Sequence, residues 1–293
     1  MTIMKIIRYL DRSGSIGYAA ESGHAGNDQI HYSKIRGDLF GEFQVTSELA
    51  QVERLLAPVD PPMIWCIGLN YRRHALESGM KIPEQPVVFA KGPNCIQHPD
   101  APILLPREAG SAEVDYECEL VIVIGKTCKD APRSRALDYV LGYTCGNDVT
   151  ARDWQFRLGG SQWCRGKNFD TFAPIGPCLA MRDSIPNPNA LRIQTVLNGE
   201  TVQDANTSDM IFDVPALVAF LSQSTTLLPG TLIFTGTPQG IGMARKPPRW
   251  LREGDEVSIV IEGIGALNNP VRNEASGNRE VGAIRSSATP GTV

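Results

Sequence analysis

The most informative segment of this chain is Tyr116-Glu-Cys-Glu-Leu-Val-Ile-Val-Ile124. It is rich in β-branched and aromatic residues, which predicts a β-strand. Successive side chains of a strand point to opposite faces, so Glu117 and Glu119 share one face, whereas Tyr116 and Cys118 share the other. Both faces are largely apolar toward the C-terminal end, which is typical of a buried strand. Two glutamates therefore lie side by side on one face of a buried strand.

Adjacent buried carboxylates repel each other and need a positive partner, either a cation or the side chains of Arg or Lys. Asp148 offers a third carboxylate, because it follows another strand-like segment, Leu141-Gly-Tyr-Thr-Cys-Gly-Asn147. Three oxygen ligands without Cys or His suit a hard cation. We therefore expect Glu117, Glu119 and Asp148 to bind one Mg²⁺ or Mn²⁺ per subunit, with purely structural ion pairs as the alternative.

The rest of the chain predicts a strand-dominated α+β fold in three regions. Residues 1–60 form a small N-terminal domain that begins with a strand and ends in a Pro-rich linker. Residues 63–272 form the main domain, with a hairpin around Asn198-Gly199, a helix over 214–223 capped by Asp213, and strands over 231–235 and 256–261. Residues 273–293 are rich in Ser, Gly and Asn and predict a disordered tail.

Composition narrows the class of function. The formal net charge of −4 over 293 residues offers no basic footprint for nucleic acid, and no apolar run has the length of a membrane span. The seven cysteines include no C-x-x-C pair, which is typical of a reducing compartment rather than a zinc or disulfide protein. We expect a cytoplasmic protein whose partner is a small molecule, not nucleic acid or a membrane.

Four polar residues are candidates for chemistry near such a cation. His74 and Glu77 lie three positions apart in a short helix-like segment before Gly79, so the carboxylate could orient the imidazole as an acid/base pair; the alternative is a solvated surface pair. Lys167, in a turn-like stretch, could offset the surplus carboxylate charge. Arg152 could steer an anionic substrate, or else form a structural ion pair with Asp153 or another acid.

The run Thr235-Gly-Thr-Pro-Gln-Gly-Ile-Gly242 superficially suggests a nucleotide site. Pro238 removes an amide donor, however, and neither G-x-G-x-x-G nor a P-loop pattern is present. We read it as a strand-end loop in which the Gly236 amide and the Thr237 hydroxyl meet a substrate carboxylate. A tight turn that simply needs glycine is the alternative.

Five segments together make the sequence resemble the fumarylacetoacetate hydrolase family over most of residues 63–271. They are Ile67-Gly-Leu-Asn-Tyr-Arg-Arg-His74, Val114-Asp-Tyr-Glu-Cys-Glu-Leu120, Asn147-Asp-Val-Thr-Ala-Arg-Asp-Trp-Gln155, Gly166-Lys-Asn-Phe169 and Phe234-Thr-Gly-Thr-Pro-Gln-Gly240. The likeness is strongest to the branch of fumarylacetoacetate hydrolase domain-containing protein 2 and the acylpyruvases. It implies a mixed β-sandwich roll, usually a homodimer, with a small N-terminal domain.

The resemblance also implies roles for individual residues. It places Glu117, Glu119 and Asp148 on the family's metal ligands and His74 and Glu77 on its catalytic pair. Arg152, Gln155 and Lys167 fall on polar positions that contact substrate, with Lys167 as a catalytic group, and Thr237 falls where a substrate carboxylate is held.

Two reactions follow from these roles. The first is metal-dependent hydrolysis of a C–C bond in 1,3-dicarbonyl acids such as acylpyruvates or fumarylpyruvate, through a metal-bound enolate. The second is tautomerisation or decarboxylation of oxaloacetate at the same site. A metal-binding protein without turnover is a third reading. Each makes a small oxo acid the partner.

Overall fold

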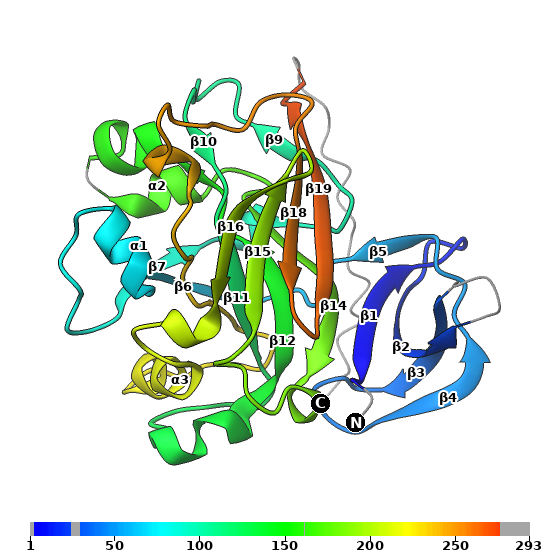
Figure 1. Ribbon diagram of the computed structural model, residues 1–293. Coiled ribbons are helices and arrows are strands. Elements are labelled where there is room, and N and C mark those ends of the chain that lie inside the picture. The colour runs from blue at the N-terminus through cyan, green and yellow to red at the C-terminus, as the bar shows by residue number, and fades with distance from the viewer. Residues whose placement is uncertain (1–2, 25–29, 161, 276–293) are drawn as a thin grey trace, which may run out of the picture.

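The computed structural model describes residues 3–24, 30–160 and 162–275, which are dominated by β-strands (Figure 1). The strands are β1 (Lys5–Leu10), β2 (Ile16–His24), β3 (Ile30–Gly37), β4 (Phe43–Leu49), β5 (Arg54–Leu56), β6 (Ile64–Gly68), β7 (Val87–Lys91), β8 (Ile96–Gln97), β9 (Ile103–Leu105), β10 (Val114–Asp115), β11 (Cys118–Ile124), β12 (Val140–Asn147), β13 (Thr150–Ala151), β14 (Ala173–Met181), β15 (Arg192–Leu197), β16 (Glu200–Asn206), β17 (Leu232–Phe234), β18 (Glu256–Ile261) and β19 (Gly265–Asn273). The predicted strand-dominated α+β class is confirmed.

Helices are few and short. They are α1 (Arg72–Glu77), α2 (Trp163–Lys167), α3 (Val214–Ser222) and a π-helix over Trp154–Leu158, with 3₁₀ turns at Pro93–Cys95, Arg133–Tyr139, Arg182–Ser184, Thr207–Asp209 and Gly242–Ala244. Asp213 caps α3 by accepting the N–H of Ala216, as predicted. Among the described residues, no helix is long and apolar enough to cross a membrane.

Two sheets pack face to face. The larger has the strand order β4-β3-β2-β1-β14-β12-β11-β17-β6-β7, with β5 beside β1 and β8 beside β14. The smaller has the order β16-β15-β18-β19-β9 and lies across β11, β12 and β14 (Figure 1). The predicted hairpin is formed by β15 and β16 around Asn198-Gly199, and the predicted strand over 256–261 is β18.

The alternation predicted for residues 116–124 is confirmed by the packing. Cys118, Leu120 and Ile122 face the core between the two sheets, together with apolar residues of β15, β18 and β19. Val121 and Val123 face the opposite core. Every residue of β11 is buried, so the strand that carries Glu119 sits at the centre of the molecule.

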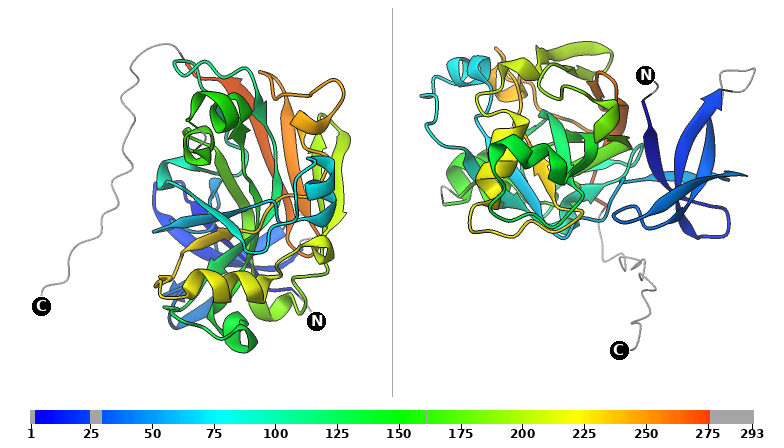
Figure 2. Two further views of the ribbon diagram at one scale, coloured as in Figure 1. Left: turned by 90° about the vertical axis from the view of Figure 1, so that its left-hand side faces the viewer. Right: turned by 90° about the horizontal axis from the view of Figure 1, so that it is seen from below.

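The first five strands lie to one side of the rest of the chain (Figure 2). They are not detached from it, because β1 pairs with β14 and places Lys5 opposite Ala180. The division of the chain near residue 60 stays a prediction. Of the predicted tail, residues 276–293 lie outside the described residues.

Candidate metal centre and active-site pocket

The three predicted ligands meet because of strand register. The antiparallel pairing of β11 with β12 sets Cys118 opposite Asn147, so Glu117 and Asp148 come next to each other at the end of the ladder. The Asp148 amide donates to the Glu117 carbonyl at 2.9 Å. Carboxylate oxygens of Glu117, Glu119 and Asp148 lie within 4.8 Å of one another, and all three residues are buried. The start of β11 and the end of β12 thus bring the three carboxylates into one acidic cluster.

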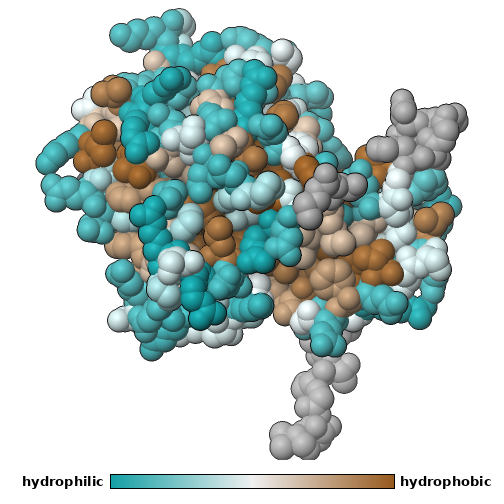
Figure 3. All heavy atoms as spheres, turned by 60° about the horizontal axis from the view of Figure 1, so that its bottom comes forward, coloured by the Kyte–Doolittle hydropathy of each residue, from teal (hydrophilic) through white to brown (hydrophobic). Residues whose placement is uncertain are grey.

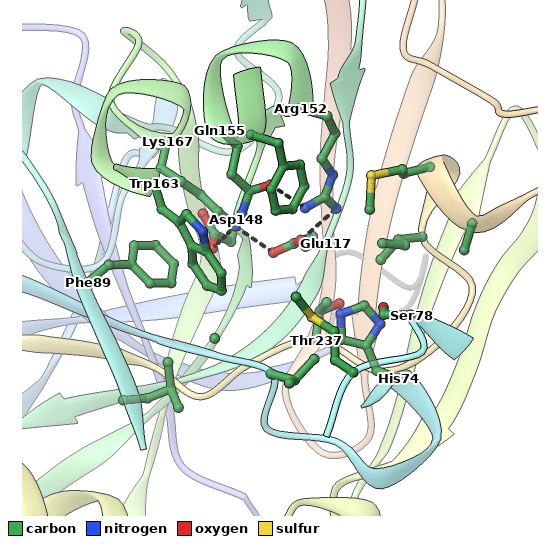
Figure 4. Close-up of a pocket in the computed structure, with 18 of the residues that line it drawn as sticks. His74, Ser78, Phe89, Glu117, Asp148, Arg152, Gln155, Trp163, Lys167 and Thr237 are labelled. Carbon is green, nitrogen blue, oxygen red and sulfur yellow. Dashed lines mark hydrogen bonds and ion pairs between the residues drawn. The ribbon is translucent and has the colours of Figure 1, made fainter. Parts of the chain in front are cut away.

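Ion pairs hold two of the carboxylates. Lys167 Nζ lies 2.9 Å from Glu117 and 2.7 Å from Asp148, and Arg152 Nη2 lies 2.6 Å from Glu117 (Figure 4). Burial alone would raise the pKa of Glu117, but Lys167 and Arg152 outweigh it and bring that pKa down to about 2. Glu117 is therefore ionised at any physiological pH.

Of the three carboxylates, Glu119 is the one that forms no ion pair with a Lys or Arg of the described residues. Its one described hydrogen bond comes from the Gly236 amide at 2.7 Å. Burial, followed by the negative charges of Asp148 and Glu117, raises its pKa well above the usual value. Full ionisation of Glu117, Glu119, Asp148 and the neighbouring Asp115 would set four negative charges against three positive ones, on Lys91, Arg152 and Lys167. These hard oxygen donors fit a divalent cation of the Mg²⁺ or Mn²⁺ type, whose charge would favour ionised Glu119.

Two residues outside the predicted set complete the ionic network. The side chain of Lys91 is fully buried; its ammonium lies 2.8 Å from Asp148 and donates to the carbonyls of Val149, Lys167 and Phe172. Asp115, which precedes the ligand strand, is also fully buried. It accepts from Arg152 Nε at 2.9 Å and from the Gly242 and Met243 amides.

The signal for Lys91 was present in the sequence. Lys91 stands two positions after Phe89 in a strand, and the two residues share a buried face. A lysine on such a face needs several oxygen acceptors, which here come from loops distant in sequence. Asp115 gave no comparable signal, because its amide donors belong to residues more than 120 positions away.

Arg152, Gln155 and Lys167 reach the pocket from neighbouring short helical segments. Lys167 belongs to the helix α2, and the turn expected from the sequence is wrong. A Cβ on Gly166 would lie 2.6 Å from the backbone nitrogen of Gln155, so glycine is needed for α2 to pack this closely. Arg152 does not pair with Asp153; it donates to Gln155 Oε1 at 3.0 Å. The Gln155 amide nitrogen is therefore left to donate elsewhere.

His74 and Glu77 approach the cluster from the opposite side, on α1. His74 Nδ1 lies 3.5 Å from Glu77 Oε2, at the i, i+3 spacing predicted. Both Glu77 oxygens accept the Gly240 amide, at 3.0 and 3.1 Å. Glu77 thereby fixes α1 against the loop that follows β17. Figure 4 shows the imidazole beside Thr237, across the pocket from Arg152 and Gln155.

These groups line one cavity of about 280 Å³. Its remaining wall is apolar and includes Phe89, Phe156 and Trp163, which pack edge to face. Trp163 fits because Gly68 has no side chain: a Cβ there would lie 2.3 Å from the indole. Thr237 lines the cavity, but Gly236 does not, since its amide faces Glu119.

Apolar side chains also gather outside the cavity. Figure 3 shows a brown patch on the side of the molecule that carries α1 and α2 in Figure 1. Large apolar side chains exposed on these segments and the adjoining π-helix are Leu76, Met80, Phe156 and Leu158. Met80 and Phe156 belong both to this surface and to the cavity lining, so the apolar wall reaches solvent.

Comparisons with known proteins identify relatives of this chain. A homolog of fumarylacetoacetate hydrolase domain-containing protein 2 from Dictyostelium discoideum is 50% identical over 228 residues, covering 75% of this chain and 74% of that protein. The mitochondrial oxaloacetate tautomerase FAHD2A of Homo sapiens is 45% identical over 217 residues, covering 74% of this chain and 68% of its own.

Solved structures share the fold as well as the sequence. A 2-hydroxyhepta-2,4-diene-1,7-dioate isomerase from Mycobacterium marinum matches with a TM-score of 0.80 and 40% identity, covering 92% of this chain and 99% of its own. The family profile described as fumarylacetoacetate (FAA) hydrolase, C-terminal, matches residues 63–272, and this family generally uses a divalent metal. The chain therefore belongs to the fumarylacetoacetate hydrolase family of enzymes.

Proposed function

We propose that this protein is a divalent-metal-dependent tautomerase that interconverts the enol and keto forms of oxaloacetate or a closely similar 2-oxo acid. The observation that carries this proposal is geometric. A single imidazole with a carboxylate partner, His74 with Glu77, faces the three-carboxylate cluster across one small cavity. Tautomerisation needs one proton moved to or from carbon beside a stabilised oxyanion, and this arrangement offers both functions. Relatives at 45–47% identity named as oxaloacetate tautomerases support the same reaction.

The residues divide the work as follows. Glu117, Glu119 and Asp148 would hold Mg²⁺ or Mn²⁺, which as a Lewis acid stabilises negative charge on the 2-oxo oxygen of the substrate. His74 transfers the proton to or from the neighbouring carbon, and Glu77 stabilises the imidazolium that forms when His74 takes the proton up. In the enol-to-keto direction His74 would take the proton from the enol oxygen and then deliver it to the neighbouring carbon, so that charge and atoms balance over one turnover.

Substrate orientation falls to the donors around the cavity. Arg152 and Lys167 attract the carboxylates of the substrate, although both are already paired with carboxylates of the protein. Gln155 presents an amide donor, and Thr237 presents a hydroxyl from the opposite side. Because the side chains of these four donors are buried, their hydrogen bonds act in a medium of low dielectric, where they are strong.

The apolar wall favours a second candidate, hydrolysis of a C–C bond in acylpyruvates. Among the described residues that line the cavity, the lysine and arginine are Lys167 and Arg152. Both lie at the acidic cluster, whereas Phe89, Phe156 and Trp163 offer an apolar surface to an acyl group. In this reaction His74 would take a proton from water, which attacks the distal carbonyl carbon. The C–C bond then breaks and the leaving carbanion is protonated.

One assay tests both candidates. Enol oxaloacetate, acetylpyruvate and fumarylpyruvate are each incubated with wild type, Glu119→Ala and His74→Ala in Mg²⁺ or Mn²⁺, with a metal-only blank because oxaloacetate tautomerises spontaneously. Loss of enol absorbance from oxaloacetate without release of pyruvate identifies tautomerisation, and pyruvate released from acetylpyruvate or fumarylpyruvate identifies hydrolysis. We expect the oxaloacetate rate to depend on added metal and to disappear in Glu119→Ala. Full activity of Glu119→Ala in EDTA would refute the metal centre.

A further inference from the structure

Gln203 lies beneath the pocket and connects the ligand strand with the Thr237 loop. It sits on β16 and is 1% exposed. Its Oε1 accepts the Cys118 amide at 3.0 Å and the Thr195 hydroxyl at 2.7 Å. Its Nε2 donates to Thr237 Oγ1 at 3.0 Å and to the Pro238 carbonyl at 2.9 Å.

The orientation of this amide is unambiguous. A backbone N–H can only donate and a backbone carbonyl can only accept, so Cys118 identifies the oxygen of Gln203 and Pro238 identifies its nitrogen. A flipped amide would place two acceptors against each other at Pro238 and two donors at Cys118. Gln203 therefore donates to Thr237, and not the reverse.

This donation decides what the Thr237 hydroxyl can do. A hydroxyl that accepts a hydrogen bond keeps its own proton for a different acceptor. Thr237 is 4% exposed and lines the cavity, and no oxygen of the described residues accepts its proton. The Cys118 side chain is the nearby alternative, but the sulfur of a thiol is only a weak acceptor. The hydroxyl is thus available as a donor to a ligand.

We propose that Gln203 is a positioning residue that holds the Thr237 hydroxyl as a hydrogen-bond donor to the substrate carboxylate. The inference rests on the proposed function, because it takes a carboxylate-bearing substrate as the ligand. Cys118 stands between Glu117 and Glu119, so the same amide fixes the substrate donor relative to the two ligand glutamates. Gln203 acts on binding through Thr237 and does not touch the reacting carbon.

A double-mutant cycle tests this coupling. Gln203→Met removes the donor while keeping the length of the side chain, and Thr237→Val removes the hydroxyl. The measurements are KM and kcat for oxaloacetate, and the Kd for oxalate in the presence of Mg²⁺. We expect each single variant to raise KM and the oxalate Kd by roughly tenfold, with kcat changed less than about threefold. Gln203→Met should add less than about twofold to Thr237→Val.

Controls separate positioning from general damage. Gln239→Met is the matched control, because Gln239 is on the same loop, donates to the Asp204 carbonyl and does not line the cavity; its KM should equal that of wild type. The Kd for Mn²⁺ should be unchanged in Gln203→Met. Full additivity of the two substitutions, or a Mn²⁺ Kd that rises together with KM, would overturn the inference.

A second variant, Gln203→Glu, tests the proposal if Gln203→Met does not fold. Gln203→Glu keeps the shape, and in its ionised form it accepts the Thr237 proton, so its KM should rise with pH relative to wild type. A parallel pH dependence would contradict the proposal. If wild type binds oxalate but turns over no 2-oxo acid, the proposed function fails while the Gln203 inference is judged on Kd. If wild type binds neither oxalate nor substrate, both fail.

Discussion

The two walls of the cavity are built on opposite physical principles. The ionic wall consists of Glu117, Glu119, Asp148, Arg152 and Lys167, all buried and linked to one another or to backbone amides. The apolar wall consists of Phe89, Phe156 and Trp163, which make edge-to-face contacts and extend from a buried position to one that is 39% exposed, at Phe156. One wall is fixed by the core of the protein, and the other ends at its surface.

We infer from this difference that the ionic wall carries the reaction and that the apolar wall carries the selectivity for the substrate. The ionic wall is tied to strand register and to a buried network, so it can change little without disturbing the fold. The apolar wall makes few directional contacts and can vary with the substituent of the substrate. The walls also differ in their effect on stability, because unpaired buried charge opposes folding whereas buried aromatic surface favours it.

We expect the largest effect from a substitution of His74 that abolishes proton transfer and leaves both walls of the cavity intact. His74→Asn removes the acid/base group but keeps a polar side chain on α1. We expect kcat for the tautomerase reaction to fall by about 10²–10⁴-fold, with the Mn²⁺ Kd unchanged, because His74 is not a member of the ligand cluster. Steady-state kinetics and Mn²⁺ titration check this together. A turnover rate equal to that of wild type would remove His74 from the mechanism.

A smaller effect sharpens the contrast between the walls. Phe156→Ala opens the apolar wall, so kcat/KM for an acylpyruvate with a bulky apolar acyl group should fall by about tenfold. The rate with oxaloacetate should stay within about twofold. Leu158→Ala is the matched control, since Leu158 lies on the same π-helix and is exposed but does not line the cavity. Equal losses for both substrates would mean that the aromatic wall is not a selectivity element.

The smallest effect concerns stability, and its sign differs between the walls. In the metal-free protein the pKa of Glu119 is raised by burial and by Asp148 and Glu117. Glu119 therefore contributes favourably to the free energy of unfolding below its unfolded pKa near 4.5. This contribution is lost as pH rises through the higher folded pKa. Glu119→Gln should then stabilise the metal-free protein at pH 7.5 by about 1 kcal/mol, a Tm rise of about 2–4 °C.

The two walls should respond in opposite directions in the same experiment. At pH 4 the gain from Glu119→Gln should vanish, because the native carboxyl is then protonated as well. Phe89→Ala, on the apolar wall, should lower Tm at both pH values because Phe89 is buried. Differential scanning calorimetry in EDTA makes both measurements. A lower Tm for Glu119→Gln at pH 7.5 would show that the ionic wall does not oppose folding.

Much of the fold and site could be predicted because the signals are local. The apolar alternation of residues 116–124, the Asn198-Gly199 turn and the Asp213 cap each act within a few residues and appear as expected. The i, i+3 spacing of His74 and Glu77 is local in the same sense. Contacts between distant segments carry no such signal, which is why the roles of Asp115 and Gln203, and the oxygen acceptors of Lys91, did not emerge from the sequence.

The sequence by itself determined the strand that carries Glu117 and Glu119, the strand-dominated class, and, through shared motifs, the family. Only the tertiary structure decided which charges neutralise which. Arg152 pairs with Asp115 and Glu117, and Gln203 donates to Thr237. Glu119 accepts a backbone amide and forms no ion pair within the part of the chain that the structure describes. The physical reason is that side-chain alternation depends on neighbours along the chain, whereas desolvation and ion pairing depend on neighbours in space.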